Sequence, residues 1–412
     1  MASLFGIFSF LQRHANCLCV LAMALLMMLA PTAVNARVKL ITLPVRERVE
    51  IQLDNPGATL VEEERIVPLV KGENQVDFSW ANTQIDSNTI VFRVIGSTGE
   101  AKLETHVVSV SYPPNEASLV WTIGASHSGS ARVRISYLLG NLTKSFAYRA
   151  VASHDEKHLV LSQYMRVDNL ANEGFSKSDV YAGFGPTFQK SIGLNVTKEM
   201  LVDKFEGVPV EKIYSCNAQE FDYLDRAQNK LRVPMHYVLK NDVDHKLGKA
   251  ALPYGKVRMF IEAAEKSHAG TAFLGEDWGK FTPKDGEMRL YLGVAQDVVV
   301  KRTIEKSEFK RVTGDLFNHD VVVKYEIENF KKEPVTLNVD ENLTYLRNEI
   351  HGKTNREVDY ELEDDTTFEG GADGEHSRSD QLEFHAKLPA ASDDGKAEKV
   401  VHKLHLILKN EW

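Results

Sequence analysis

Hydrophobic and polar residues alternate with a period of two over most of the chain from Arg37 onward. A strand with one face on a core and one in water has this period, whereas an amphipathic helix repeats every 3.6 residues. Turn residues such as Asn55-Pro56-Gly57 and Pro113-Pro114 separate the alternating segments. The clearest predicted strands contain Val49, Ile51 and Leu53; Val76, Phe78 and Trp80; Val133, Ile135 and Tyr137; and Val321, Val323, Tyr325 and Ile327.

The alternating segments form three blocks, which predict a mainly β fold of consecutive β-sandwich-like domains. We expect an N-terminal β domain over residues 37–125, a central β domain over 126–305 and a C-terminal domain over 306–412. The last block holds about seven short predicted strands, one of them a candidate at 343–349. This number and spacing favour an immunoglobulin-like sandwich that folds alone, although the cysteine pair of antibody domains is absent.

One short helix is expected in the central domain, near residues 217–231. Asn217 and Glu220 have the spacing of a capping pair, and Phe221, Leu224 and Leu231 recur on roughly one face. A helix with one narrow apolar stripe typically covers the end of a sheet, and a recognition helix is the alternative. The preceding segment, 186–214, is polar and weakly patterned, and we interpret it as a long excursion from the sheet.

The first 36 residues have the three-part layout of a secretory signal peptide. Arg13 precedes an apolar run from Leu18 to Ala30, and small residues lead to Ala36. This layout predicts cleavage between Ala36 and Arg37 and a secreted, periplasmic or extracellular protein with no membrane span after signal removal. A membrane anchor is the alternative, but it needs roughly 20 apolar residues and more basic flanks.

Charge and cysteine content narrow the possible partners and chemistry. After removal of the signal, 48 basic and 58 acidic side chains remain, a net charge of −10 without a basic cluster, which argues against nucleic acid and anionic lipid surfaces. Cys17 and Cys19 lie in the signal, so Cys216 remains without a disulfide partner. No basic residue adjoins Cys216, which favours an ordinary buried thiol over a reactive one.

A stretch from Leu252 to Arg302 combines a Pro-Tyr-Gly turn, two alternating strands and a loop with Gly275-Glu276-Asp277-Trp278. With the segments Val49–Trp80 and Glu328–Leu343, it resembles a secreted bacterial domain family of unknown function that includes the mucoidy-inhibitor A proteins. The resemblance implies an exported β fold over most of the mature chain. It implies almost nothing about activity.

Two histidine-containing motifs could suggest catalysis. His154 and His158 flank Asp155-Glu156-Lys157, but the neighbouring residues alternate with period two and predict a hairpin tip. Two histidines bind zinc in this spacing only when they share a helix face. Ser126-His127-Ser128 lacks the Gly-x-Ser-x-Gly spacing of a nucleophile elbow and indicates a polar turn. We expect no catalytic residue, metal ligand or cofactor from these motifs.

Two acidic segments are the other candidates. The loop 363–380 carries carboxylates that could bind calcium, but its spacing fits no EF-hand, and such loops are usually solvated. Glu276, Asp277 and Trp278 combine carboxylates with an aromatic ring, the composition of a sugar subsite. Adjacent carboxylates on a strand point to opposite faces and cannot flank one glycosidic bond. An ordinary turn with a tryptophan at the edge of the core is therefore the favoured interpretation, and a ligand surface formed by these three residues is the alternative.

These patterns predict an exported, non-catalytic β protein of the cell envelope or extracellular space that binds an envelope protein or a polysaccharide. Fold alone does not fix function, so this prediction depends on the absence of a catalytic constellation in the sequence. The alternative is a glycan-active or metal-dependent hydrolase whose site is assembled from distant strands, with Glu276, Asp277, His154 and His158 as candidates.

Overall fold

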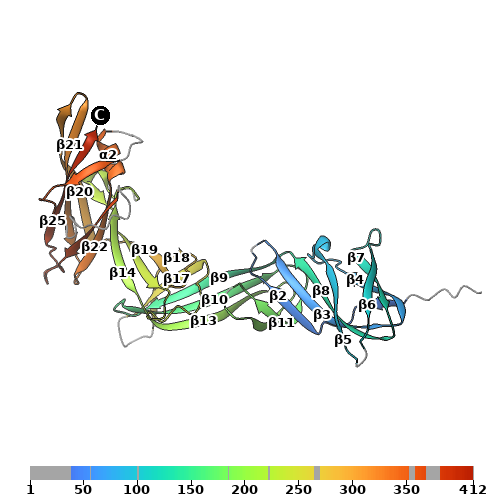
Figure 1. Ribbon diagram of the computed structural model, residues 1–412. Coiled ribbons are helices and arrows are strands. Elements are labelled where there is room, and N and C mark those ends of the chain that lie inside the picture. The colour runs from blue at the N-terminus through green and yellow to red at the C-terminus, as the bar shows by residue number, and fades with distance from the viewer. Residues whose placement is uncertain are drawn as a thin grey trace, which may run out of the picture. The chain divides into compact units, whose positions relative to one another are not determined.

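The computed structural model describes residues 39–411 except 56, 100, 101, 184, 221, 222, 264–269, 352–357 and 368–380. Strands dominate these residues, and their one α-helix is α2 (Leu343–His351), which confirms the mainly β prediction (Figure 1). None of the helical turns in the described ranges is long and apolar enough to cross a membrane. The chain divides into two compact units.

The first unit contains residues up to 47 together with 63–81 and 91–135. Its four-stranded sheet has the order β1-β4-β7-β6. Trp121 of β7 lies in the core, 3% exposed, with ring centroids 4.6 Å from Phe92 and 5.8 Å from Phe78. The strands of this unit are β1 (Lys39–Thr42), β4 (Gly72–Ser79), β5 (Val91–Ser97), β6 (Thr105–Ser111) and β7 (Ser118–Ala125), with parts of β3 (Thr59–Leu69) and β8 (Gly129–Leu139).

The second unit begins with a five-stranded sheet of order β13-β10-β9-β17-β18. The hairpin β9 (Leu142–Ala152) and β10 (His158–Asn169) forms its centre, and β17 (Gly255–Glu262) pairs with β9 in parallel. A Cβ at Gly255 would lie 2.4 Å from the Phe146 carbonyl oxygen, so this close pairing requires glycine. The remaining strands of this sheet are β13 (Thr197–Pro209) and β18 (Thr271–Gly279). In the same unit, β11 (Phe175–Tyr181) pairs with both β2 (Arg48–Gln52) and β12 (Phe188–Ile192). A short 3₁₀ turn, η1, spans Ser87–Thr89.

Two further five-stranded sheets of this unit, β19-β16-β14-β22-β24 and β15-β20-β21-β25-β23, contribute to one hydrophobic core. Phe384 and Leu406 are buried in this core, as their alternation predicts. The strands are β14 (Glu211–Asn217), β15 (Lys230–Leu231), β16 (Pro234–Lys240), β19 (Glu287–Val294), β20 (Val298–Thr313), β21 (Leu316–Asn329), β22 (Val335–Asn342), β23 (Asp359–Leu362), β24 (Gln381–Leu388) and β25 (Lys399–Glu411).

The domain boundary placed at 305/306 falls inside β20, and this is a correction to the sequence analysis. Residues 298–313 form one continuous strand. The parallel pairing of β14 with β22 also adds residues 211–217 to the C-terminal sheets. The alternation identifies each strand, but it carries no information about which strands pair. The immunoglobulin-like topology stays a prediction.

The helix predicted at 217–231 is wrong. Among the described residues of that segment, β14 ends at Asn217, a 3₁₀ turn η2 spans Arg226–Gln228, and β15 follows. The Asn217 side chain accepts hydrogen bonds from the amides of Gln219 and Glu220, so the expected cap closes a turn instead. Leu231 is buried as part of a strand.

The helix lies instead at α2, where a strand was the candidate. Asn342 accepts a hydrogen bond from the Tyr345 amide and caps its first turn. Leu343 and Leu346 are fully buried, three positions apart, and Ile350 packs on the same core. This spacing is helical, and the short segment also matches an alternating strand.

The interpretation of 186–214 as an excursion is also wrong. β12 and β13 occupy much of that segment, and β13 pairs with β10 along its length. The outer positions of β13 are exposed, including Leu201 and Val202, so no clean inside–outside alternation marks it in the sequence. A register shift between Gln163 and Tyr164 of β10 disturbs the period further.

Candidate functional site

Glu276, Asp277 and Trp278 lie on β18, which the sheet order places last after β9 and β17 (Figure 1). Arg258 of β17 pairs with Glu276 on one side and with Arg149 of β9 on the other. β9 is distant in sequence from β17 and β18, yet the three strands present their side chains side by side.

The strand period divides these side chains between two faces of the sheet. Val257 and Met259 are fully buried, whereas Lys256 and Arg258, which alternate with them, face solvent. The cross-strand partners of Lys256 and Arg258 are Trp278 and Glu276, so these two residues also lie on the outer face. Asp277 pairs with Val257 and lies on the opposite face.

Aromatic rings gather at two places on the outer face. Trp278 is 50% exposed and stacks on Tyr254, 55% exposed, with ring centroids 5.1 Å apart and planes within 2°. Phe260 and Phe273 meet edge to face at 5.5 Å. Lys256 and Phe260 are four residues apart on one strand, so the two groups are separated by roughly 13 Å. We call this surface the aromatic face; it consists of Arg149, Tyr254, Lys256, Arg258, Phe260, Phe273, Glu276 and Trp278.

The aromatic face carries more positive than negative charge. Glu276 pairs with Lys256 at 2.8 Å and with Arg258 at 3.5 Å. The hydrogen bond from Lys256 lowers the pKa of Glu276, so this carboxylate is ionised at neutral pH. Lys256 also lies over the Trp278 ring, and Arg149 over the Phe260 ring, at 5.2 and 4.9 Å from the centroids. The aromatic face thus holds three cations and one carboxylate in a protein of net charge −9.

Asp277 has a different role from Glu276. Its carboxylate accepts hydrogen bonds from the backbone amides of Trp278 and Tyr291, both at 2.7 Å, and the second contact links β18 to β19. The two adjacent carboxylates therefore serve different partners. Their geometry does not match the facing pair that glycoside hydrolysis requires.

The histidines of the apparent zinc motif lie at the β9–β10 hairpin tip, as predicted. Asp155 accepts hydrogen bonds from Ser153 and Lys157, and Glu156 binds Lys212 and Tyr237. His154 follows Arg149 by five residues, which places it roughly 16 Å farther along the sheet than the register of Glu276. The register therefore does not assemble Glu276, Asp277, His154 and His158 into one site.

The other candidates from the sequence fall partly within the described residues and partly outside them. Ala36, Arg37 and residues 368–380 of the acidic loop are outside them, whereas Asp365 binds His405 of β25. Ser126 and His127 form the turn between β7 and β8. Across the part of the chain that is described, no three His, Cys, Asp or Glu side chains gather as metal ligands would.

Cys216 is buried, 1% exposed, in the core of the C-terminal sheets. Burial and the nearby Glu341 carboxylate raise the pKa of its thiol, so the sulfur stays protonated and unreactive. This agrees with its interpretation as an ordinary buried cysteine.

No protein-family model matches this chain, and no curated protein matches it in sequence. Any function assigned to this chain therefore depends on the geometry of the aromatic face. Sequence analysis identified Glu276 and Trp278, but it missed Tyr254, Lys256, Arg258 and Arg149. The alternation of Lys256 and Arg258 with Val257 and Met259 was the available signal, because it places two cations on the polar face of a predicted strand.

Proposed function

We propose that this chain is an exported, non-catalytic binding protein of the cell envelope or extracellular space, and that its aromatic face binds a polysaccharide containing acidic sugars. The observation that carries the proposal is the half-exposed Trp278–Tyr254 stack. Large aromatic side chains are normally covered, and exposed ones in a group mark binding surfaces. The leader ending at Ala36 and the resemblance to the mucoidy-inhibitor A family support export.

The chemistry of the aromatic face favours a sugar chain over an envelope protein. Aromatic rings offer flat apolar surfaces that pack against the apolar faces of sugar rings. Arg149, Lys256 and Arg258 place hydrogen-bond donors beside the rings. Their three positive charges outnumber the one negative charge of Glu276. Uronic acid carboxylates would accept hydrogen bonds from these cations in a charge-assisted geometry.

Binding to polyuronate can be measured by affinity electrophoresis against neutral dextran. Because exposed aromatic anchors dominate binding energy, Trp278→Ala should weaken polyuronate binding about tenfold or more. Phe330→Ala, at a residue 43% exposed outside the aromatic face, is the matched control and should bind as the wild type does. Arg258→Glu should also weaken binding, whereas Lys332→Glu, an exposed charge reversal elsewhere, should not.

Three results would overturn the proposal. Unchanged binding in Trp278→Ala and Arg258→Glu would show that another surface binds the polymer. Equal affinity for a single-stranded oligodeoxynucleotide would show unspecific attraction of polyanions. Failure to bind glycans, combined with photocrosslinking from position 278 to one envelope protein, would show that the partner is a protein. N-terminal sequencing of the exported protein should start at Arg37, and a first residue at Met1 would contradict export with cleavage.

A further inference from the structure

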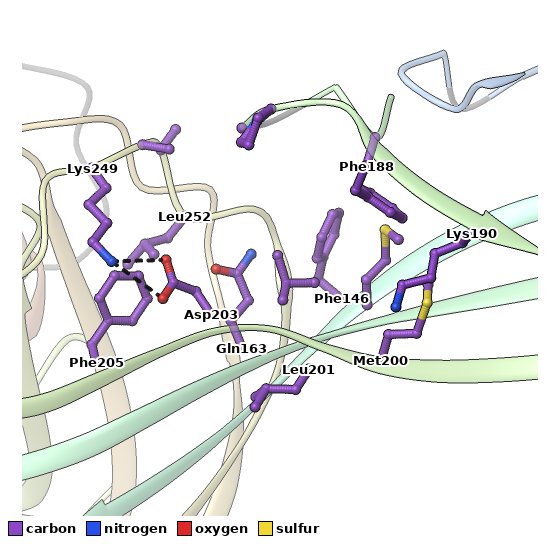
Figure 2. A pocket seen from close by; sticks show the side chains of 17 residues that line it. Phe146, Gln163, Phe188, Lys190, Met200, Leu201, Asp203, Phe205, Lys249 and Leu252 are labelled. Atoms are coloured by element: carbon purple, nitrogen blue, oxygen red, sulfur yellow. Dashed lines mark hydrogen bonds and ion pairs between the residues drawn. The ribbon is translucent and has the colours of Figure 1, made fainter. Parts of the chain in front are cut away.

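A second site lies between β12, β13, β10 and β9, outside the aromatic face. A pocket of about 480 Å³ is bordered by these strands and by the segment Lys249–Leu252 (Figure 2). This volume is within the range of small-molecule sites, about 300–1,000 Å³.

One end of the pocket is apolar. Phe146 of β9 pairs with Met165 of β10, which pairs with Met200 of β13, so three strands place apolar side chains in one row. Phe188 of β12 also lines this end (Figure 2). Leu201 of β13 pairs with Tyr164 and is 55% exposed, so its side chain lies on the other face of the sheet. The apolar row is therefore formed by Phe146, Met165 and Met200.

The other end is polar, and it holds the amide of Gln163. This residue is 7% exposed as a whole and lines the pocket. Figure 2 shows its amide pointing into the pocket between the Phe146 ring and the Lys249–Asp203 pair. An amide both donates and accepts hydrogen bonds, so at this position it can pair with a complementary polar group of a ligand.

Lysine side chains lie at both ends of the pocket. Lys249 contacts Asp203 at 3.4 Å, longer than a charge-assisted hydrogen bond, and its ammonium has three protons to donate. Lys190 lies at the apolar end, beyond Met200, and forms no ion pair within the described part of the chain (Figure 2). Two cations and one carboxylate give the pocket a positive charge in an acidic protein, which favours an anionic ligand.

We propose that this pocket binds an amphiphile with a single alkyl chain and an anionic head group. The alkyl chain packs along Phe146, Met165 and Met200, where water would otherwise cover apolar surface. The head group accepts hydrogen bonds from the Gln163 amide and the Lys249 ammonium. A free fatty acid and a phospholipid derivative share this chemistry.

Isothermal titration of the full exported chain with sodium dodecanoate, below its micelle concentration, tests the proposal. Dodecanoate should bind, whereas dodecyltrimethylammonium, with the same chain and a cationic head, and butyrate, with the same head and a short chain, should bind at least about tenfold more weakly. A parallel titration with lysophosphatidylglycerol distinguishes the two sources of the head group. Tighter binding of dodecanoate would indicate a free fatty acid, and tighter binding of lysophosphatidylglycerol would indicate a phospholipid derivative.

Variants separate a built site from general hydrophobic adsorption. Gln163→Leu should weaken dodecanoate binding about tenfold, because it removes the amide that pairs with the head group. Met200→Asp should abolish binding because it places a charge in the apolar row, whereas Leu201→Asp, at the next residue on the opposite face of β13, should not. Lys249→Glu should weaken binding, and Lys332→Glu should have no effect.

Equal binding of dodecanoate and dodecyltrimethylammonium would overturn the proposal, as would full binding in Met200→Asp. The same holds if both anionic amphiphiles fail to bind the correctly folded wild type. Met200 is only half-buried, so its substitution should leave the fold intact, and circular dichroism checks the fold of each variant.

Discussion

Arg302 is a fully buried charged side chain held by three partners. Its guanidinium donates to both carboxylate oxygens of Glu341, at 2.7 and 2.9 Å, and to Glu349 of α2 at 2.9 Å. Tyr223 lies 3.1 Å away, and the Tyr325 hydroxyl donates to Glu341. The bidentate geometry and the extra hydrogen bonds offset the cost of removing these charges from water.

Replacing Arg302 by methionine tests this network. The Arg302→Met variant leaves Glu341 buried without its cation, so the free energy of unfolding should fall by about 3–5 kcal/mol in urea denaturation. Arg311→Met, at an exposed position of the same strand, should change it little. The double variant Arg302→Met/Glu341→Leu should be more stable than Arg302→Met, because it also removes the carboxylate. Equal or lower stability would show that the unpaired Glu341 is not the cause of the destabilisation.

At the residue scale, sequence reasoning found the side chains of β18 but not their neighbours. Glu276 and Trp278 are identifiable by composition, because carboxylates beside an aromatic ring resemble a sugar subsite. Tyr254 and Lys256 belong to the same surface only because the β17–β18 register places Lys256 opposite Trp278. The register depends on strand pairing, which a single sequence does not specify.

At the element scale, the hairpin β20–β21 carries a histidine pair near its distal end. His319 of β21 contacts His351 of α2 through their ring nitrogens, and Ser307 lies 2.9 Å from the other nitrogen of His319. The Phe309 ring stacks on His319 with centroids 4.1 Å apart. Helix and hairpin are thus joined through a pair of imidazoles.

Stability of this contact should fall as the solution becomes acidic. Burial and the neighbouring His351 lower the pKa of His319 to about 4, below its ordinary value of 6.5, although the adjacent Asp320 opposes the shift. Burial also lowers the pKa of His351. Both groups bind protons more readily in the unfolded chain, so the free energy of unfolding should decrease as pH falls from about 6.5 to 4.

Melting temperature measured between pH 7.5 and 4 checks this dependence. His319→Gln, which keeps a polar side chain without titration, should reduce the loss of stability across this window. His154→Gln at the exposed β9–β10 tip should retain the wild-type profile. A profile of His319→Gln that parallels the wild type would show that the acid sensitivity arises elsewhere.

Element types were predictable where the pattern was long and unambiguous. β21 alternates over Val321 to Ile327 and was predicted correctly. Short segments failed, because Asn217 with Glu220 closes a turn and Asn342 caps a real helix, although both are good cap residues. The difference is decided by tertiary packing, since Leu343 and Leu346 have a core to enter.

At the scale of the whole molecule, the C-terminal core is built from segments that are distant in sequence. Tyr214, Leu231, Val298 and Val300 lie in the same core cluster as Phe384. β14 and β16 also extend the sheet that contains β22 and β24. The alternation predicts strands with one apolar and one polar face in this region. A domain that starts at residue 306 nevertheless leaves out the core residues that come from earlier segments.

A fragment of residues 306–412 should therefore not fold alone, contrary to the expectation from the sequence. It lacks the N-terminal half of β20 and the parallel partner of β22, so apolar faces on both sheets would be exposed to water. The fragment 211–412 restores these strands and should unfold cooperatively in urea. Circular dichroism compares the two; a cooperative transition of 306–412 at equal stability would contradict this account.

Cys216 is the single cysteine downstream of residue 36, and its reactivity can report on opening of the core. Cys216 lies on β14, within the core shared by both C-terminal sheets. A thiol reagent can reach it only when that core opens, so the rate of alkylation under native conditions records the frequency of opening without any introduced probe. Alkylation of Cys216 would thus report how often the two C-terminal sheets separate.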